Sequence, residues 1–170
     1  MTVTYRDATI DDADALSVLG RRTFIATFGH LYAPEDLDQF LANHDPEKWE
    51  SELADPDFAI RLAEDEGHAI GYCKIGPAAL PFTPPEGAIE LRQLYLMESW
   101  KGSGYSDVLM NWAIEQGRAR GASEIYLSVF TDNDRARAFY ARHAFTEVGP
   151  YKFMVGNHAD DDIVMKRALK

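Results

Sequence analysis

Apolar and polar positions in the first half of the chain predict one strand, three helices and a hairpin. Residues 3–8 alternate as a strand does, and an apolar stripe with helical spacing then runs for about four turns to Phe28. Prolines open two further short helices, at Pro34 and Pro46. Asp65-Glu66-Gly67 is a reverse-turn sequence between two apolar runs, which predicts an antiparallel hairpin.

The second half alternates strands and helices more regularly. The predicted elements are a strand over 88–97, an amphipathic helix over 106–120, a strand over 123–130, a helix capped by Asp132 that ends at His143, and strands over 145–155 and 163–169. The unit over 88–130 should form a right-handed parallel crossover. We therefore expect an α/β fold with a mixed, mostly antiparallel central sheet, a parallel βαβ crossover and flanking helices. No linker divides the sequence, so residues 1–170 are expected to form a single domain. The proline-rich segment 76–87 reads as a surface loop long enough to be functional.

Composition narrows the class of protein and of partner. The 170 residues are 46% hydrophobic and 26% charged, as in ordinary soluble domains. No apolar run approaches the ~18 residues that span a bilayer, and no signal peptide is evident, so we expect a cytoplasmic protein without a membrane partner. The net charge of −11 disfavours nucleic acid and favours a cationic small molecule or basic peptide. The single cysteine, Cys73, is expected to be buried.

The strongest chemical signal is the junction between the strand and helix near residue 100. The apolar strand ends at Met97, and a loop containing Gly102 and Gly104 leads into the next helix. Glycines allow close backbone approach, and the first N–H groups of a helix bind anions such as a diphosphate. The P-loop pattern is absent, and the dinucleotide fingerprint fails at Asp107, where glycine is required. No metal is expected: Asp160-Asp161-Asp162 lacks the rest of a calcium loop and is interpreted as a solvated turn.

Two motifs carry a resemblance to a known family. Lys101-x-x-Gly104-x-Ser106 resembles the [QR]-x-x-G-x-[GA] signature of the GCN5-related N-acetyltransferases (GNAT), whose loop holds the pyrophosphate of acetyl-coenzyme A. Asn133-x-x-Ala136-x-x-Phe139-Tyr140 resembles a helix of the same family, and Ala144 precedes Phe145 where relatives usually have glycine. Lys101, Ser106 and Ala144 depart from the usual pattern. Segments 23–29 and 151–165 also resemble the PaiA-type polyamine acetyltransferase branch.

The resemblance spans nearly the whole chain and implies the acyl-CoA N-acyltransferase fold. It implies transfer of acetyl from acetyl-CoA to a primary amine of a small cationic metabolite or a peptide, without a metal. A non-catalytic acyl-CoA sensor is the alternative. A homodimer would be in keeping with the family, in which dimers are common. The implied coenzyme-binding residues are Leu94, Tyr95, Leu96, Lys101, Gly102, Ser103, Gly104, Tyr105, Ser106, Asn133 and Tyr140.

Candidate catalytic and acceptor residues follow from the same comparison. The Tyr140 phenol, with an ordinary pKa of about 10, suits protonation of the leaving thiolate. Glu90 is the candidate base, although an ion pair with Arg92 explains it as well. Phe28, His30 and Tyr32 are candidate acceptor contacts. Packing or a helix end explains them equally.

Overall fold

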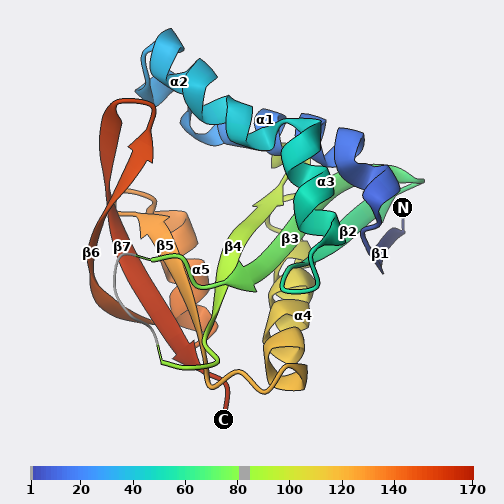
Figure 1. Ribbon diagram of the computed structural model, residues 1–170, viewed down its shortest axis with the longest axis vertical. Coiled ribbons are helices and arrows are strands. Elements are labelled where there is room, and N and C mark those ends of the chain that lie inside the picture. The colour runs from blue at the N-terminus through green and yellow to red at the C-terminus, as the bar shows by residue number, and fades with distance from the viewer. Residues whose placement is uncertain (1, 81–84) are drawn as a thin grey trace.

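A computed structural model describes residues 2–80 and 85–170 of the chain (Figure 1). The helices are α1 (Ala13–Phe28), α2 (Pro34–Leu41), α3 (Pro46–Ala54), α4 (Tyr105–Ala119) and α5 (Asp134–Arg142). The strands are β1 (Val3–Asp7), β2 (Ala59–Asp65), β3 (His68–Pro77), β4 (Ile89–Leu96), β5 (Glu124–Phe130), β6 (Thr146–Val155) and β7 (His158–Ala168). The middle of the proline-rich segment expected to be a functional loop lies outside the described residues. No helix in the described ranges is long and apolar enough to cross a membrane.

The strands form one mixed sheet in the order β1-β2-β3-β4-β5-β7-β6. Every neighbouring pair is antiparallel except β4 and β5, which are parallel and are connected through α4. This arrangement confirms the expected mostly antiparallel sheet with one crossover. The predicted hairpin is also present, with Glu66 and Gly67 both at positive φ in the tight turn between β2 and β3.

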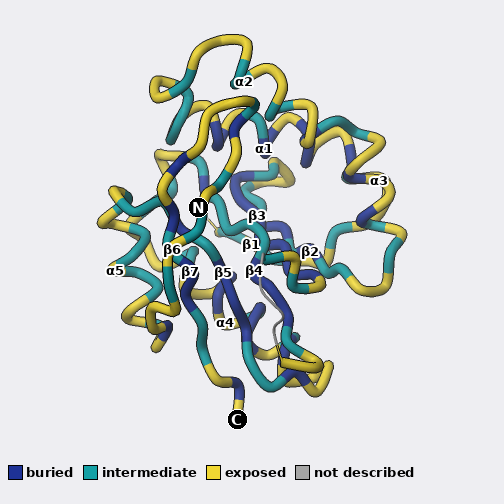
Figure 2. Tube along the Cα trace, turned by 60° about the vertical axis from the view of Figure 1, so that its left-hand side comes forward, coloured by how far each residue is buried: buried dark blue, intermediate teal, exposed yellow. Residues whose placement is uncertain are grey.

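Helices cover both faces of the sheet. Alternation along β3 sends Tyr72 to the cluster shared with α1 and α3, and sends Cys73 to the cluster shared with α4 and α5. Cys73 is fully buried, as expected, and Figure 2 shows the buried positions concentrated along the central strands. Helices α1 and α3 therefore pack on one face of the sheet, and α4 and α5 pack on the other.

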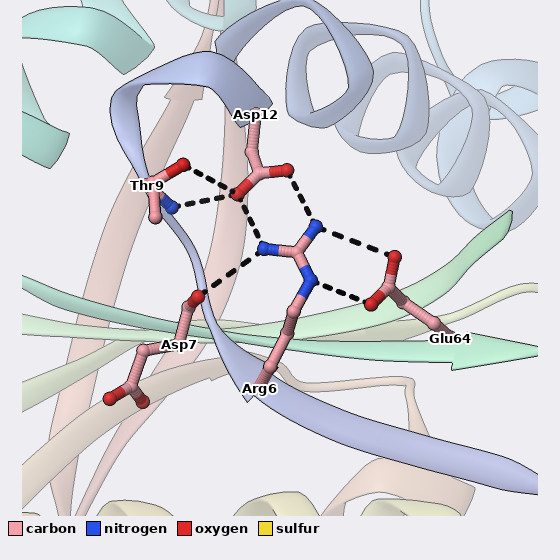
Figure 3. Close-up of polar contacts among 5 residues, drawn as sticks. All are labelled: Arg6, Asp7, Thr9, Asp12 and Glu64. Atoms are coloured by element: carbon pink, nitrogen blue, oxygen red, sulfur yellow. Dashed lines mark hydrogen bonds and ion pairs between the residues drawn. The ribbon is translucent and has the colours of Figure 1, made fainter. Parts of the chain in front are cut away.

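A short 3-10 turn, Ile10–Asp12, leads into α1. Arg6 on β1 pairs with Asp12 at 2.8 Å and with Glu64 on β2 at 2.7 Å (Figure 3). The Asp12 carboxylate also accepts a hydrogen bond of 2.7 Å from the Thr9 backbone N–H, which completes a capping box. The turn is thus fixed by Thr9 and Asp12.

The parallel contact between β4 and β5 is very short. Only Ile89 with Ile125 and Glu90 with Tyr126 are in register, although both strands continue well beyond these pairs. A bulge in β4 beside Ile75 marks the point where the strand bends. Beyond it the two strands separate. The β5-facing backbone groups of β4 therefore lack a strand partner there.

The acidic triplet of residues 160–162 corrects the expectation of a solvated turn. All three residues lie within β7, because the strand begins at His158 and pairs with both β5 and β6. Strand alternation leaves Asp161 exposed beside Lys152 and turns Asp160 and Asp162 inward, where they are 6% and 7% exposed. Burial of aspartates is uncommon, so their surroundings need a specific explanation.

Candidate functional site

A cavity of about 550 Å³ opens where β4 and β5 separate. Its lining comes from the end of β4, the loop before α4, the end of β5, α5 and the last turn of α1. The predicted residues that line it are Phe28, Leu94, Tyr95, Leu96, Lys101, Gly102, Gly104, Ser106, Asn133 and Tyr140. Ser103, Tyr105, His30, Tyr32 and Glu90 do not line the cavity. The two motifs therefore meet at one cavity.

The loop before α4 has the backbone form that an anion requires. Gly102 and Gly104 adopt φ values of +82° and +87°, which side chains larger than glycine rarely allow. Nothing lies within 4 Å of where a Cβ of Gly104 would stand, so that side of the loop is open. Tyr105 begins the helix, whose first-turn N–H groups have no partner within the helix. This geometry fits the diphosphate of coenzyme A.

Basic side chains gather around the same loop in an otherwise acidic protein. Lys101, Arg135 and Arg142 all line the cavity. Lys101 and Arg135 share Glu98, at 3.0 and 3.9 Å, which holds their charges near the loop. The sequence reading missed both arginines. Their position on the same helix as the Asn133 motif could have pointed to them. Their approach to the loop, however, depends on tertiary packing.

Helix α5 is held at both ends by specific caps. Asn133, rather than the expected Asp132, is the N-cap, since its side-chain oxygen accepts a bond of 3.2 Å from the Ala136 N–H. The Asn133 amide NH₂ is left available toward the cavity. At the other end, the Phe145 N–H donates to the Tyr140 carbonyl at 3.1 Å, with Ala144 at φ +66°. The family's usual glycine position therefore keeps its left-handed backbone here with an alanine.

Tyr140 lies on the inner face of α5. Its ring packs 5.9 Å from that of Phe145 and 5.5 Å from that of Phe139, and Phe139 also contacts the main core. Burial raises the pKa of the Tyr140 phenol above its ordinary value, so the group stays protonated at neutral pH. A neutral phenol facing the cavity is able to donate a proton.

Glu90 lies where β4 and β5 are still paired, next to the point at which the two strands separate. It pairs in register with Tyr126, where β4 and β5 still touch, and accepts a bond of 2.9 Å from the Ala79 N–H. Arg92 lies 3.8 Å away, as the simpler ion-pair interpretation expects. Burial raises the Glu90 pKa. Its role as the base stays a prediction.

The candidate acceptor residues lie around the end of α1. The Phe28 ring lines the cavity and meets Phe130 edge-on at 6.2 Å. Tyr32 is partly buried and donates a hydrogen bond to Asp160, while His30 is exposed. Phe28 therefore lines the cavity itself. Tyr32 lies outside the cavity lining, beside the buried aspartates.

Comparison with known proteins places the chain among acetyltransferases. The model of the acetyltransferase (GNAT) family matches residues 23–145. An uncharacterized N-acetyltransferase of Mycobacterium tuberculosis (strain ATCC 25618 / H37Rv) is 33% identical over 159 residues, covering 93% of this chain and 98% of that protein. An uncharacterized N-acetyltransferase of Lactobacillus delbrueckii subsp. lactis is 30% identical over 161 residues, covering 93% and 92%.

Solved structures agree in fold. The crystal structure of PaiA N-acetyltransferase from Thermoplasma acidophilum in complex with coenzyme A superposes with a TM-score of 0.81 and 20% identity, over 99% of each chain. An N-acetyltransferase from Staphylococcus aureus Mu50 superposes with a TM-score of 0.78, also at 20% identity, over 100% of each chain. At this level of identity the likeness concerns the fold alone.

Proposed function

The chain belongs to the acetyltransferase (GNAT) family, and we propose that it transfers the acetyl group of acetyl-coenzyme A to a primary amine of a small cationic metabolite. Acetyl-coenzyme A is the acetyl donor of this family and supplies an activated thioester. The observation that carries the proposal is the single cavity lined by both the glycine loop and Tyr140.

The loop before α4 binds the diphosphate in this proposal. Backbone N–H groups over 102–106 and the positive end of the α4 dipole supply the main attraction. Lys101, Arg135 and Arg142 add charge, and the Asn133 amide donates to the diphosphate or the pantetheine arm. Ser106 offers a hydroxyl where relatives have glycine or alanine. Coenzyme binding is therefore the first property to measure in variants of Lys101 and Ser106.

The separated edge of β4 orients the thioester. Leu94, Tyr95 and Leu96 line the cavity where β5 no longer pairs with them, so their backbone groups are able to bond the pantetheine arm as an added strand would. One N–H of this edge polarises the thioester carbonyl and stabilises the oxyanion that forms on it. Tyr140 then gives its phenolic proton to the departing thiolate.

The acceptor enters from the α1 side of the sheet. Phe28 and Tyr32 provide aromatic surface there, and the buried aspartates of β7 give that side a negative charge. Both features favour an alkyl ammonium, as does the net charge of −11. A small cationic amine therefore fits better than a neutral acceptor, with a basic peptide amine as the second candidate. His30 is the most exposed of the three candidate contacts.

A thiol-release screen tests the proposal. Polyamines, amino acids, aminoglycosides and peptides are each mixed with protein and acetyl-coenzyme A, and free thiol is measured. Acetylation of a cationic amine is expected. Coenzyme binding by calorimetry without thiol release from any acceptor would instead support the acyl-CoA sensor, and absence of coenzyme binding would overturn both. Gel filtration of the same sample tests the homodimer, and a single unfolding transition tests the single domain.

A further inference from the structure

The two buried aspartates of β7 have unequal partners. The Asp160 carboxylate accepts a hydrogen bond from the Tyr32 hydroxyl and lies 3.1 Å from Nε2 of His158. Asp162 has the Ser128 hydroxyl as a polar neighbour. Within residues 2–80 and 85–170, no lysine, arginine or histidine forms an ion pair with Asp162. Asp162 is thus a buried carboxylate without a counter-ion.

Ser128 joins this carboxylate to the cavity. On the antiparallel pair of β5 and β7, Asp162 is opposite Phe130 and Ser128 is opposite Val164, so the two side chains are diagonal neighbours on one face. Ser128 also lines the cavity that Tyr140 lines. Ser128 therefore lies between the cavity and Asp162. A hydroxyl in that position is able to accept one proton while it donates another.

We propose that Ser128 and Asp162 form a proton relay that deprotonates the acceptor ammonium. This rests on the proposed function and assigns the base to Asp162 in place of Glu90. The ammonium N–H bond breaks as Ser128 Oγ takes the proton, and the original hydroxyl proton passes to the Asp162 carboxylate. The nitrogen lone pair is then free to attack the thioester carbonyl carbon, and the C–S bond breaks as the thiolate takes the Tyr140 proton. The nitrogen loses its second proton as the amide forms, and this proton restores the Tyr140 phenol. Asp162 returns its proton to solvent after product release.

The relay has a defined pH dependence. Burial, together with the neighbouring charges of Asp160 and Asp161, raises the pKa of Asp162 to about 7, and the nearby Ser128 hydroxyl opposes the rise. Three tyrosines also face this group: Tyr32, Tyr95 and Tyr151, the last of which also lies near Glu90. Desolvation keeps the tyrosines protonated at neutral pH, so they do not titrate there. The relay is active when Asp162 is ionised, and the rate should rise with pH through about 7.

Two substitutions test the relay against matched controls. Asp162→Asn removes the proton acceptor and the buried charge, and Ser128→Ala removes the connecting hydroxyl. Asp161→Asn makes the same chemical change at the exposed neighbour, and Ser128→Thr keeps a hydroxyl. Calorimetry with coenzyme A and thermal unfolding first establish that each variant is folded. The pH profile of kcat/KM is then measured with an alkyl amine, whose ammonium form predominates at neutral pH, and with an analogue whose pKa is below the assay pH.

The relay predicts a selective loss. With the alkyl amine, Asp162→Asn and Ser128→Ala should lower kcat/KM by about 10²-fold and abolish the rise near pH 7. Ser128→Thr should retain the rise because it keeps a hydroxyl, and Asp161→Asn should retain it at a slightly lower pH because one charge beside Asp162 is removed. With the amine that is already neutral, the loss should shrink to less than about threefold, since no proton must be removed before attack.

An unchanged profile in Asp162→Asn, or an equal loss for both amines, would overturn the relay. The same rise abolished by Glu90→Gln alone would assign the base to Glu90. If the wild-type protein acetylates neither amine nor any member of the screen, the proposed function itself is wrong. This outcome is distinct from failure of the relay alone.

Discussion

The Tyr32 hydroxyl donates a hydrogen bond to the Asp160 carboxylate, joining residues 128 positions apart in the sequence. Tyr32 follows α1 and also stacks on Phe24 with ring centroids 6.0 Å apart. Asp160 lies on β7, so the bond ties the segment after α1 to the C-terminal strand of the chain.

We expect Tyr32→Phe to lower the free energy of unfolding by about 1–3 kcal/mol. The substitution leaves a buried carboxylate with His158 as its only remaining side-chain partner within the described parts of the chain. Urea unfolding measures the change, and Tyr5→Phe is a matched control that should lose little. If the bond carries the effect, Tyr32→Phe should cost much less in an Asp160→Ala background.

Tyr140→Phe should lower kcat by about 10²-fold or more and leave coenzyme A binding within about twofold. The substitution removes the phenolic proton and keeps the ring that packs on Phe145. Steady-state kinetics and calorimetry measure the two effects. Undiminished turnover would remove Tyr140 from the chemistry. Because burial raises the Tyr140 pKa above 10, the wild-type profile should show no falling limb from this group below pH 10.

Ala144→Gly should stabilise the protein by about 0.5–1 kcal/mol. The alanine sits at φ +66°, a left-handed conformation that costs an L-residue about 1–2 kcal/mol, and relief of this strain exceeds the added flexibility of the unfolded chain. Chemical denaturation measures the gain. Gly121→Ala is the mirror-image control, because Gly121 has φ +74° with open space at its Cβ position, and it should destabilise by a similar amount. Destabilisation by Ala144→Gly would contradict the strain argument.

The unfolding free energy should depend on His44 between about pH 4 and 6.5. Burial lowers the His44 pKa to about 4, so in this window the unfolded chain binds a proton that the folded protein does not. Stability therefore rises with pH through the window, by at most ~1.4 kcal/mol per pH unit. Urea unfolding at several pH values measures this slope. In His44→Phe the slope should decrease, and an unchanged slope would assign it to other groups.

Local sequence patterns predicted most of the fold because they act within single elements. Apolar periodicity, prolines and a cap residue predicted the five α-helices, and the turn sequence Asp65-Glu66-Gly67 predicted the hairpin, in which Glu66 and Gly67 adopt positive φ. Cap positions were less predictable, since Asp132 and Asn133 are both good caps and only packing of α5 selects between them. The junction between the glycine loop and α4 was also predictable, because its residues are adjacent in the sequence.

The missed features depend on residues that are distant in sequence. Asp160 and Asp162 look like a turn because buried strands rarely contain aspartate, and their polar neighbours in the fold include Tyr32, which is distant in sequence. Arg135 approaches the glycine loop through the packing of α5, which its own sequence does not encode. The cavity was inferred from its motifs, whereas its acceptor side became visible only in three dimensions.

The two-pair seam between β4 and β5 makes the sheet mechanically weakest at its centre. A pantetheine arm that bonds to the free edge of β4 would bridge β4 and β5. Coenzyme binding would then stiffen the centre of the sheet in each catalytic cycle, and product release would loosen it. Heat resistance should consequently track cosubstrate supply: in a cell rich in acetyl-coenzyme A, the protein would survive temperatures that unfold it when the pool is depleted.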